Sequence, residues 1–134
     1  MANILYFTEA ASIGIHGMIY IVQNKNKVNI LQIAEAIGAS KHHVAKVMQK
    51  LVKDKYLKSI RGPSGGFILN KEPNKISLYD IYTSIEGEIE TEQCPAHNQY
   101  CPKNLCIIGR YGTEISRQLV SKMKEDTLDN FIEN

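Results

Sequence analysis

The feature that most constrains the fold is a pair of short amphipathic segments that meet at a glycine, within residues 29–53. In the first segment, Asn29 and Gln32 have the spacing of a helix-capping box, and isoleucines recur behind them at helical spacing. Gly38 stands where a left-handed turn would end that helix, a conformation in which a side chain would cost energy. Ser40 can cap a second helix, so the two segments predict a helix-turn-helix.

The second predicted helix has an apolar face and a basic face. Its apolar residues recur at steps of three and four, and they are Val44, Val47, Met48, Leu51 and Val52. His42, Lys46, Gln49 and Lys53 point the opposite way on a helix of this periodicity. In a helix-turn-helix the second helix enters the DNA major groove with its N-terminal residues nearest the bases. The pattern therefore predicts a recognition helix.

Basic residues concentrate around this helix. Residues 41–61 hold seven lysines and arginines against one acidic residue, which gives a formal charge of +6 in a chain that carries only +2. The rest of the chain is therefore acidic. Such a block is either a solvated helix face or the electrostatic footprint of a nucleic-acid-binding surface, and its position favours the second interpretation.

A hairpin is predicted directly after the recognition helix. The runs YLKSI and GFILN have strand character, and the linking RGPSGG contains a proline and three glycines. A hairpin at this place is the wing of a winged helix, with Arg61 at its root. A hairpin of an unrelated fold is the alternative, but the order of helix, helix, basic helix and hairpin disfavours it.

The C-terminal third predicts two more helices and a dimer. SLYDIYTSIEG indicates a helix capped by Ser77, and residues 103–125 indicate a long helix followed by a short closing segment near residues 128–132. The long helix carries an apolar stripe, which consists of Ile108, Tyr111, Ile115, Leu119 and Met123. We interpret this stripe as a dimer seam. The alternative is that it packs onto its own domain. The expected fold is mainly α with a small β-hairpin wing. It comprises a winged helix-turn-helix DNA-binding domain (residues 1–85), a cysteine-containing sensor loop (86–106), and a dimerisation helix with its closing segment (107–134).

All three cysteines lie in CPAHNQYCPKNLC, residues 94–106. No signal peptide or apolar run of about 18 residues is present, so a reducing, cytoplasmic location without membrane contact is expected. Thiolates are the preferred ligands of iron–sulfur clusters. A zinc site completed by His97, a metal-free thiol switch, and incidental cysteines remain open as alternatives.

The order of these parts resembles the Rrf2 family of bacterial transcription regulators, the group that contains IscR-type and NsrR-type repressors. The resemblance runs nearly end to end through IAEAIGASKHHVAKVMQKL, the wing RGPSGGFIL, SLYDIYTSIEG, the clustered cysteines and the closing TLDNFI. It implies a winged-helix homodimer with an iron–sulfur cluster, of two-iron or four-iron type, that controls affinity for a double-stranded operator with paired half-sites. Such a cluster can be absent from a sample prepared in air.

The resemblance also assigns residues. The matching DNA-contact positions are Ser40, Lys41, His42, His43 and Lys46 in the recognition helix, and Arg61, Gly62, Pro63 and Ser64 in the wing. The matching cluster ligands are Cys94, Cys101 and Cys106. Where relatives supply a fourth ligand this chain has Gly109 or Ser12, so the candidates for that role are Glu9, His16 and His97.

Other classes of protein fit the sequence less well. An iron–sulfur carrier would not need the basic helix or the wing, and a winged helix that binds protein would not need the basic block. No nucleophile–base pair, phosphate loop or paired-carboxylate site stands out, so no enzyme activity and no small-molecule substrate is expected.

Overall fold

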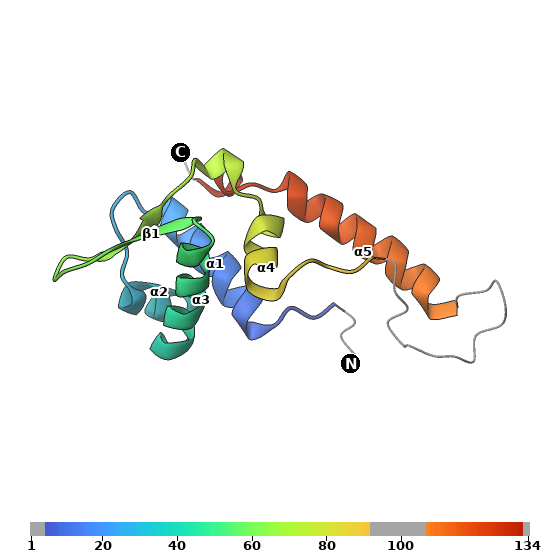
Figure 1. The fold of residues 1–134 in the computed structure, drawn as a ribbon, viewed down its shortest axis with the longest axis horizontal. Helices are drawn as coiled ribbons and strands as arrows, with labels where there is room; N and C mark the ends of the chain where they lie inside the picture. Colours follow the sequence, from blue (N-terminus) through green and yellow to red (C-terminus); the bar gives the residue numbers. More distant parts are fainter. Residues whose placement is uncertain (1–4, 92–106, 133–134) are drawn as a thin grey trace.

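The computed structural model describes residues 5–91 and 107–132, as five α-helices, two strands and two 3-10 turns. The elements are α1 (Glu9–Gln23), α2 (Ile30–Ile37), α3 (Lys41–Lys53), β1 (Leu57–Ile60), β2 (Gly66–Leu69), η1 (Pro73–Lys75), α4 (Leu78–Glu86), α5 (Ile107–Glu125) and η2 (Leu128–Phe131). Figure 1 shows α1–α4 and the hairpin gathered into a head, from which α5 extends. The mainly helical fold with a two-stranded hairpin confirms the expected fold class.

The helix-turn-helix forms through the caps that its sequence contains. The Asn29 side chain accepts a hydrogen bond from the Gln32 backbone, and the Gln32 side chain accepts one from the Asn29 backbone, both at 2.9 Å. Gly38 ends α2 in the left-handed region with φ 70°. The Ser40 hydroxyl accepts from the His43 amide at 3.2 Å and starts α3. The predicted turn between the two helices is thereby confirmed.

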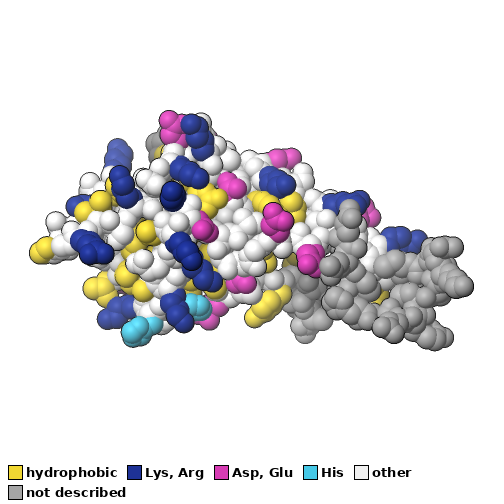
Figure 2. Space-filling model, in the orientation of Figure 1, with side chains coloured by type: hydrophobic (Ala, Val, Ile, Leu, Met, Phe, Trp, Pro, Cys, Tyr) yellow, Lys and Arg dark blue, Asp and Glu magenta, His cyan; other side chains and the backbone are white. Residues whose placement is uncertain are grey.

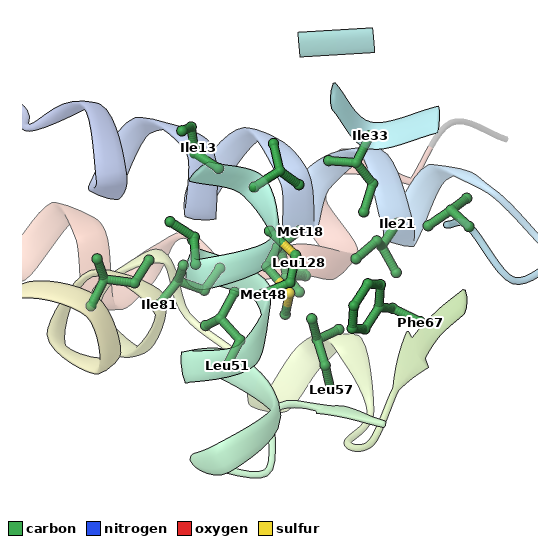
Figure 3. Close-up of a cluster of buried hydrophobic side chains, with 14 of the residues drawn as sticks. Ile13, Met18, Ile21, Ile33, Met48, Leu51, Leu57, Phe67, Ile81 and Leu128 are labelled. Atoms are coloured by element: carbon green, nitrogen blue, oxygen red, sulfur yellow. The ribbon is translucent and has the colours of Figure 1, made fainter. Parts of the chain in front are cut away.

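An apolar core lies where α1, α2, α3, α4 and the hairpin meet (Figure 3). Met18, Ile33 and Met48 are fully shielded from solvent. Leu128 of η2 is also fully buried, and its amide donates to the Ile76 carbonyl at 3.0 Å. Burying each such side chain stabilises the fold by about 1.5–3 kcal/mol, so the C-terminal turn anchors the end of α5 to the head.

The predicted hairpin is antiparallel, and its register runs from Leu57 opposite Leu69 to Ile60 opposite Gly66. Val28, in the turn before α2, joins it through two hydrogen bonds with Phe67. Gly66 permits this contact, since a Cβ there would lie 2.6 Å from the Val28 carbonyl oxygen. The wing is therefore fastened to the start of the helix-turn-helix.

The boundaries and burial of two helices differ in detail from expectation. The apolar spacing of SIGIHGMIYIV predicts a helix over residues 12–22. The first helix instead begins at Glu9, because the Thr8 hydroxyl caps it by accepting from the Ala11 amide. Met123, assigned to the seam of the long helix, is buried at 6% exposure, whereas Ile108 and Ile115 are 51% and 46% exposed. No helix within the described ranges is long and apolar enough to cross a membrane.

Candidate nucleic-acid interface

The first turn of α3 presents the polar side chains that the sequence predicted for the recognition helix. Lys41, His42 and Lys46 are exposed, and His43 is half-buried. Ser40, His42, His43 and Lys46 together line a shallow hollow in the surface. The structure thus brings all five predicted positions of the recognition helix onto one end of α3.

The wing projects beside this helix. Arg61, Gly62, Pro63 and Ser64 are exposed at its turn, and Gly62 has φ 109°, a conformation that favours glycine. A groove of about 370 Å³ separates the wing from the start of α2 and from Gln49 of α3. Asn29, which caps α2, and Ile30 and Leu31 in its first turn also line the groove, and they were not predicted as part of the site. The 58% exposure of apolar Leu31 in the first turn of α2 marks this groove in the structure.

Figure 2 shows lysine and arginine side chains spread over the half of the molecule that carries α2, α3 and the wing, with histidines at its edge. Exposed Lys25 and Lys27, in the turn before Val28, also belong to this half and lie outside the predicted basic block. Lys50 behaves differently from the rest of the block: its ammonium group donates to the Ile85 carbonyl at 3.3 Å. That lysine joins α3 to the C-terminal end of α4.

Two further hydrogen bonds join the end of α4 to residues at the end of α3 and at the start of α1. The Ser84 hydroxyl donates to Asp54, at the end of α3, and the Thr8 hydroxyl donates to Glu86 at 2.6 Å. Partial burial, followed by the Glu86 carboxylate, raises the pKa of the Tyr82 phenol in the same turn. The chain continues from this anchored turn through residues 87–91 toward the cysteines.

Only some of the residues predicted for the cysteine site lie among those that the structure describes. Cys94, Cys101, Cys106 and His97 lie outside the described residues. Of the other candidate ligands, Glu9 has an oxygen 3.4 Å from Nδ1 of His43, and Nδ1 of His16 lies 2.7 Å from the Ser12 carbonyl oxygen. Over residues 5–91 and 107–132, no group of three His, Cys, Asp or Glu side chains is placed to hold a metal ion.

Several regulators of transcription are similar to this chain in sequence. An HTH-type transcriptional regulator of Aquifex aeolicus is 28% identical, over 96% of this chain and 92% of its own length. NsrR of Bacillus subtilis is 36% identical over 60% of this chain, and IscR of Pectobacterium atrosepticum is 22% identical over 80%. The matches cover only 52% of that NsrR and 65% of that IscR.

Solved structures share the fold. The global cysteine regulator CymR of B. subtilis superimposes with a TM-score of 0.72, at 22% identity, over 94% of this chain and 95% of its own. T. potens IscR gives a TM-score of 0.75 at 23% identity, over 93% and 84%. The oxidized form of Staphylococcus aureus CymR gives 0.75 at 20%, over 97% and 98%. At these identities the likeness shows a shared fold.

The model of one family, Rrf2, described as an iron-dependent transcriptional regulator, matches residues 7–134. That span covers the recognition helix, the wing, the cysteine segment and the long helix. The predicted resemblance is therefore confirmed, and the relatives are regulators rather than enzymes. The chain belongs to the Rrf2 family of transcriptional regulators.

Proposed function

We propose that this chain is a dimeric repressor that binds a double-stranded operator and whose affinity is controlled through its three cysteines. The DNA-binding part of this proposal rests on one observation. The first turn of α3 and the wing lie on the same basic side of the molecule. A winged helix inserts its recognition helix into the major groove, and its wing reaches the DNA backbone or the minor groove.

The exposed side chains divide into two kinds of contact. Lysines such as Lys41 and Lys46 neutralise phosphates and supply affinity that depends on salt. Ser40 and His42 have the size and hydrogen-bonding groups to read base edges. Arg61, at the root of the wing, supplies a phosphate or minor-groove contact. Lys50 also donates to the Ile85 carbonyl, which holds its side chain toward the end of α4.

A homodimer would cover the exposed part of the α5 stripe. Ile108, Tyr111 and Ile115 have exposed fractions of 51%, 63% and 46%. Side chains of this kind at helical spacing are the usual content of a helix–helix seam. A two-fold dimer would place two recognition helices on paired half-sites, so a small change in the separation of the heads would change operator affinity.

The donor set of the cysteine segment fits an iron–sulfur cluster. Cys94, Cys101 and Cys106 would hold it, with a fourth ligand from Glu9, His16 or His97, and three thiolates within thirteen residues suit this role. When bound, such a group supplies iron that reacts with oxygen or nitric oxide. A metal-free thiol switch is the second candidate, and the fold likeness to CymR, solved also in an oxidized form, favours it. A zinc site with His97 is the third.

Coupling between the cysteines and DNA is proposed to run through the end of α4. Lys50 of α3 and Asp54, the residue after α3, hold that turn through Ile85 and Ser84. Ordering or freeing the segment that follows would therefore act on the recognition helix and on the spacing of the heads.

The test of DNA binding is a salt titration of affinity, by fluorescence anisotropy, for a duplex recovered by the protein from a random library. Arg61→Ala is expected to weaken binding and to flatten the slope of log K against log salt by about one unit, because one phosphate contact is lost. Lys75→Ala is the matched control: Lys75 lies in η1, outside α3 and the wing, and is paired with Glu72 at 3.5 Å. Equal slopes for Arg61→Ala and the parent would remove Arg61 from the interface.

A further inference from the structure

The groove between the wing and the helix-turn-helix is uncharged, although basic residues flank it. None of the described residues that line its volume of about 370 Å³ is a lysine, arginine, aspartate or glutamate. Lys46 lies three residues before the lining residue Gln49 in α3, and Arg61 directly precedes the lining residue Gly62 in the wing. The groove is therefore an uncharged channel within the basic half of the molecule (Figure 2).

Gln49 and Ser59 supply polar side chains to this groove, from α3 and from the hairpin. Gln49 lies seven residues after His42, and it therefore shares the helix face of that predicted DNA contact. Ser59 lies in β1 opposite Phe67, whose side chain is buried in the core. Because side chains alternate along a strand, Ser59 shares the face of Phe67 and Lys58 points to the other face. The fold thus directs a hydroxyl, rather than an ammonium group, into the groove.

Both side chains are available to a ligand. Gln49 and Ser59 are exposed, and neither the Gln49 amide nor the Ser59 hydroxyl has a hydrogen-bond partner within residues 5–91 and 107–132. An amide nitrogen and a hydroxyl both donate hydrogen bonds. A ligand that displaces water from the groove must accept these bonds, because a polar group that leaves water unpaired costs free energy. The groove therefore favours a ligand that is rich in hydrogen-bond acceptors.

The geometry of duplex DNA identifies such a ligand. In a duplex, one phosphodiester strand separates the major groove from the minor groove. When α3 lies in the major groove and the wing at the minor groove, that strand must pass between the two elements, where this groove lies. Gly62 and Gly65 on the wing side have no side chains, so a strand can come close to the wing backbone. Phosphate oxygens then meet the donors, and the carbon face of the sugars suits Leu31 on the α2 side.

Charge favours DNA over the other class of occupant, an apolar segment of a protein. Leu31 is 58% exposed and would suit such a segment. However, an apolar segment would leave Gln49 and Ser59 unpaired. It would also gain nothing from the positive charges of Lys46 and Arg61 beside the groove, whereas a strand of phosphates is attracted by both.

We propose that the groove between α3 and the wing holds one phosphodiester strand of the operator, and that Gln49 and Ser59 donate uncharged hydrogen bonds to its phosphates. The inference rests on the proposed DNA-binding function. It gives these two residues a distinct signature, because a neutral donor releases no counterion and its contribution to affinity does not vary with salt. A phosphate contact also carries no sequence information, so the contribution is the same for every duplex.

The first test repeats the salt titration with the duplex recovered from the random library and with a scrambled duplex of the same composition. Gln49→Ala is expected to lower affinity for both about tenfold, the lower end for a hydrogen bond to a charged group. The slope of log K against log salt should stay unchanged, whereas Lys46→Ala should flatten it by about one unit. Gln118→Ala is the matched control, because Gln118 is also exposed but lies in α5, outside the groove.

The outcomes separate this inference from the proposal on which it rests. A loss for Gln49→Ala that is confined to the selected duplex would indicate a base contact and overturn the inference. Parent-like affinity of both Gln49→Ala and Ser59→Ala would also overturn it, and is the result expected if an apolar protein segment occupies the groove. If Arg61→Ala still weakens binding in that case, the DNA-binding proposal stands alone. If the parent recovers no duplex, both fall.

The second test locates the phosphate. Single methylphosphonates, each of which replaces a charged phosphate oxygen with a methyl group, are placed at equivalent positions of the two half-sites. At one position Gln49→Ala should cost less than about twofold, because the contact is already weakened there, while the loss stays near tenfold elsewhere. A loss for Gln49→Ala that is the same at every position of the duplex overturns the inference.

Discussion

Gly14, on the face of α1 that meets α4, allows a close helix contact that a single methyl group should disrupt. A Cβ at Gly14 would lie 2.0 Å from Cδ1 of Ile85, 3.4 Å from Cγ1 of Val47 and 3.5 Å from Cγ2 of Ile81. Carbon atoms in contact normally lie about 3.5–4.0 Å apart. The Ile85 methyl group must therefore move in a Gly14→Ala variant.

Two effects of opposite sign determine the magnitude for Gly14→Ala. In an open helix interior, replacing glycine by alanine stabilises by about 1 kcal/mol. Overpacking a filled core costs about 1–3 kcal/mol. We expect the second effect to win, so that the free energy of unfolding falls by about 1 kcal/mol. Urea unfolding followed by circular dichroism measures it, at a fixed protein concentration because dimerisation would contribute to stability.

Ile85→Val provides the control, because it removes the methyl group that obstructs Gly14→Ala. Alone it should cost about 0.5–1.5 kcal/mol. Combined with Gly14→Ala it should bring stability back to within about 0.5 kcal/mol of the parent, since the new Cβ occupies the vacated space. Strictly additive losses in the double variant, or a Gly14→Ala variant more stable than the parent, would refute this account of the α1–α4 contact.

Three further predictions concern the cysteines, the dimer and alkaline stability. Cys101→Ala should lower the iron and sulfide bound after anaerobic purification and leave the unfolding curve nearly unchanged, which metal analysis and circular dichroism check; retained iron and sulfide would count against a cluster on this thiol. Ile115→Glu should convert a dimer into monomer in sedimentation velocity, because it places a charge in the proposed seam, and an unchanged mass would move the dimer interface elsewhere. Burial raises the phenol pKa of Tyr56 and Tyr82 above 10.0, so the neutral phenols are favoured in the fold. Their contribution to stability is complete below about pH 10 and should be lost as the pH rises through the folded-state values, whereas Phe replacements should remove that dependence in alkaline urea titrations.

Local sequence rules predicted the helix-turn-helix because each of its signals acts over a few residues. The Asn29 and Gln32 box, the left-handed Gly38 and the Ser40 cap all formed as their spacing indicated. The glycines of the wing were also predictable, although the contact of Gly66 with Val28 was not, because it joins segments far apart in the chain.

The long-range contacts of the site could not be predicted from the sequence, because they depend on how the helices pack. Lys50 is in the basic block by composition, yet it binds the Ile85 carbonyl, which depends on how α4 packs against α3. Glu9 and His43 are brought together only by the packing of α1 beside α3. The stripe of α5 had the correct period, but its sequence did not show that Met123 would be buried while Ile108 and Ile115 stay exposed.

The central claim is that the cysteines control the affinity of the winged helix for its operator. The most direct measurement is the affinity of anaerobically purified protein for its selected duplex, before and after exposure to air, with the visible spectrum recorded on the same samples. The account predicts that affinity and spectrum change together in the parent, and that neither changes in a Cys94→Ala, Cys101→Ala, Cys106→Ala triple variant. An affinity that is the same before and after exposure in the parent would contradict it.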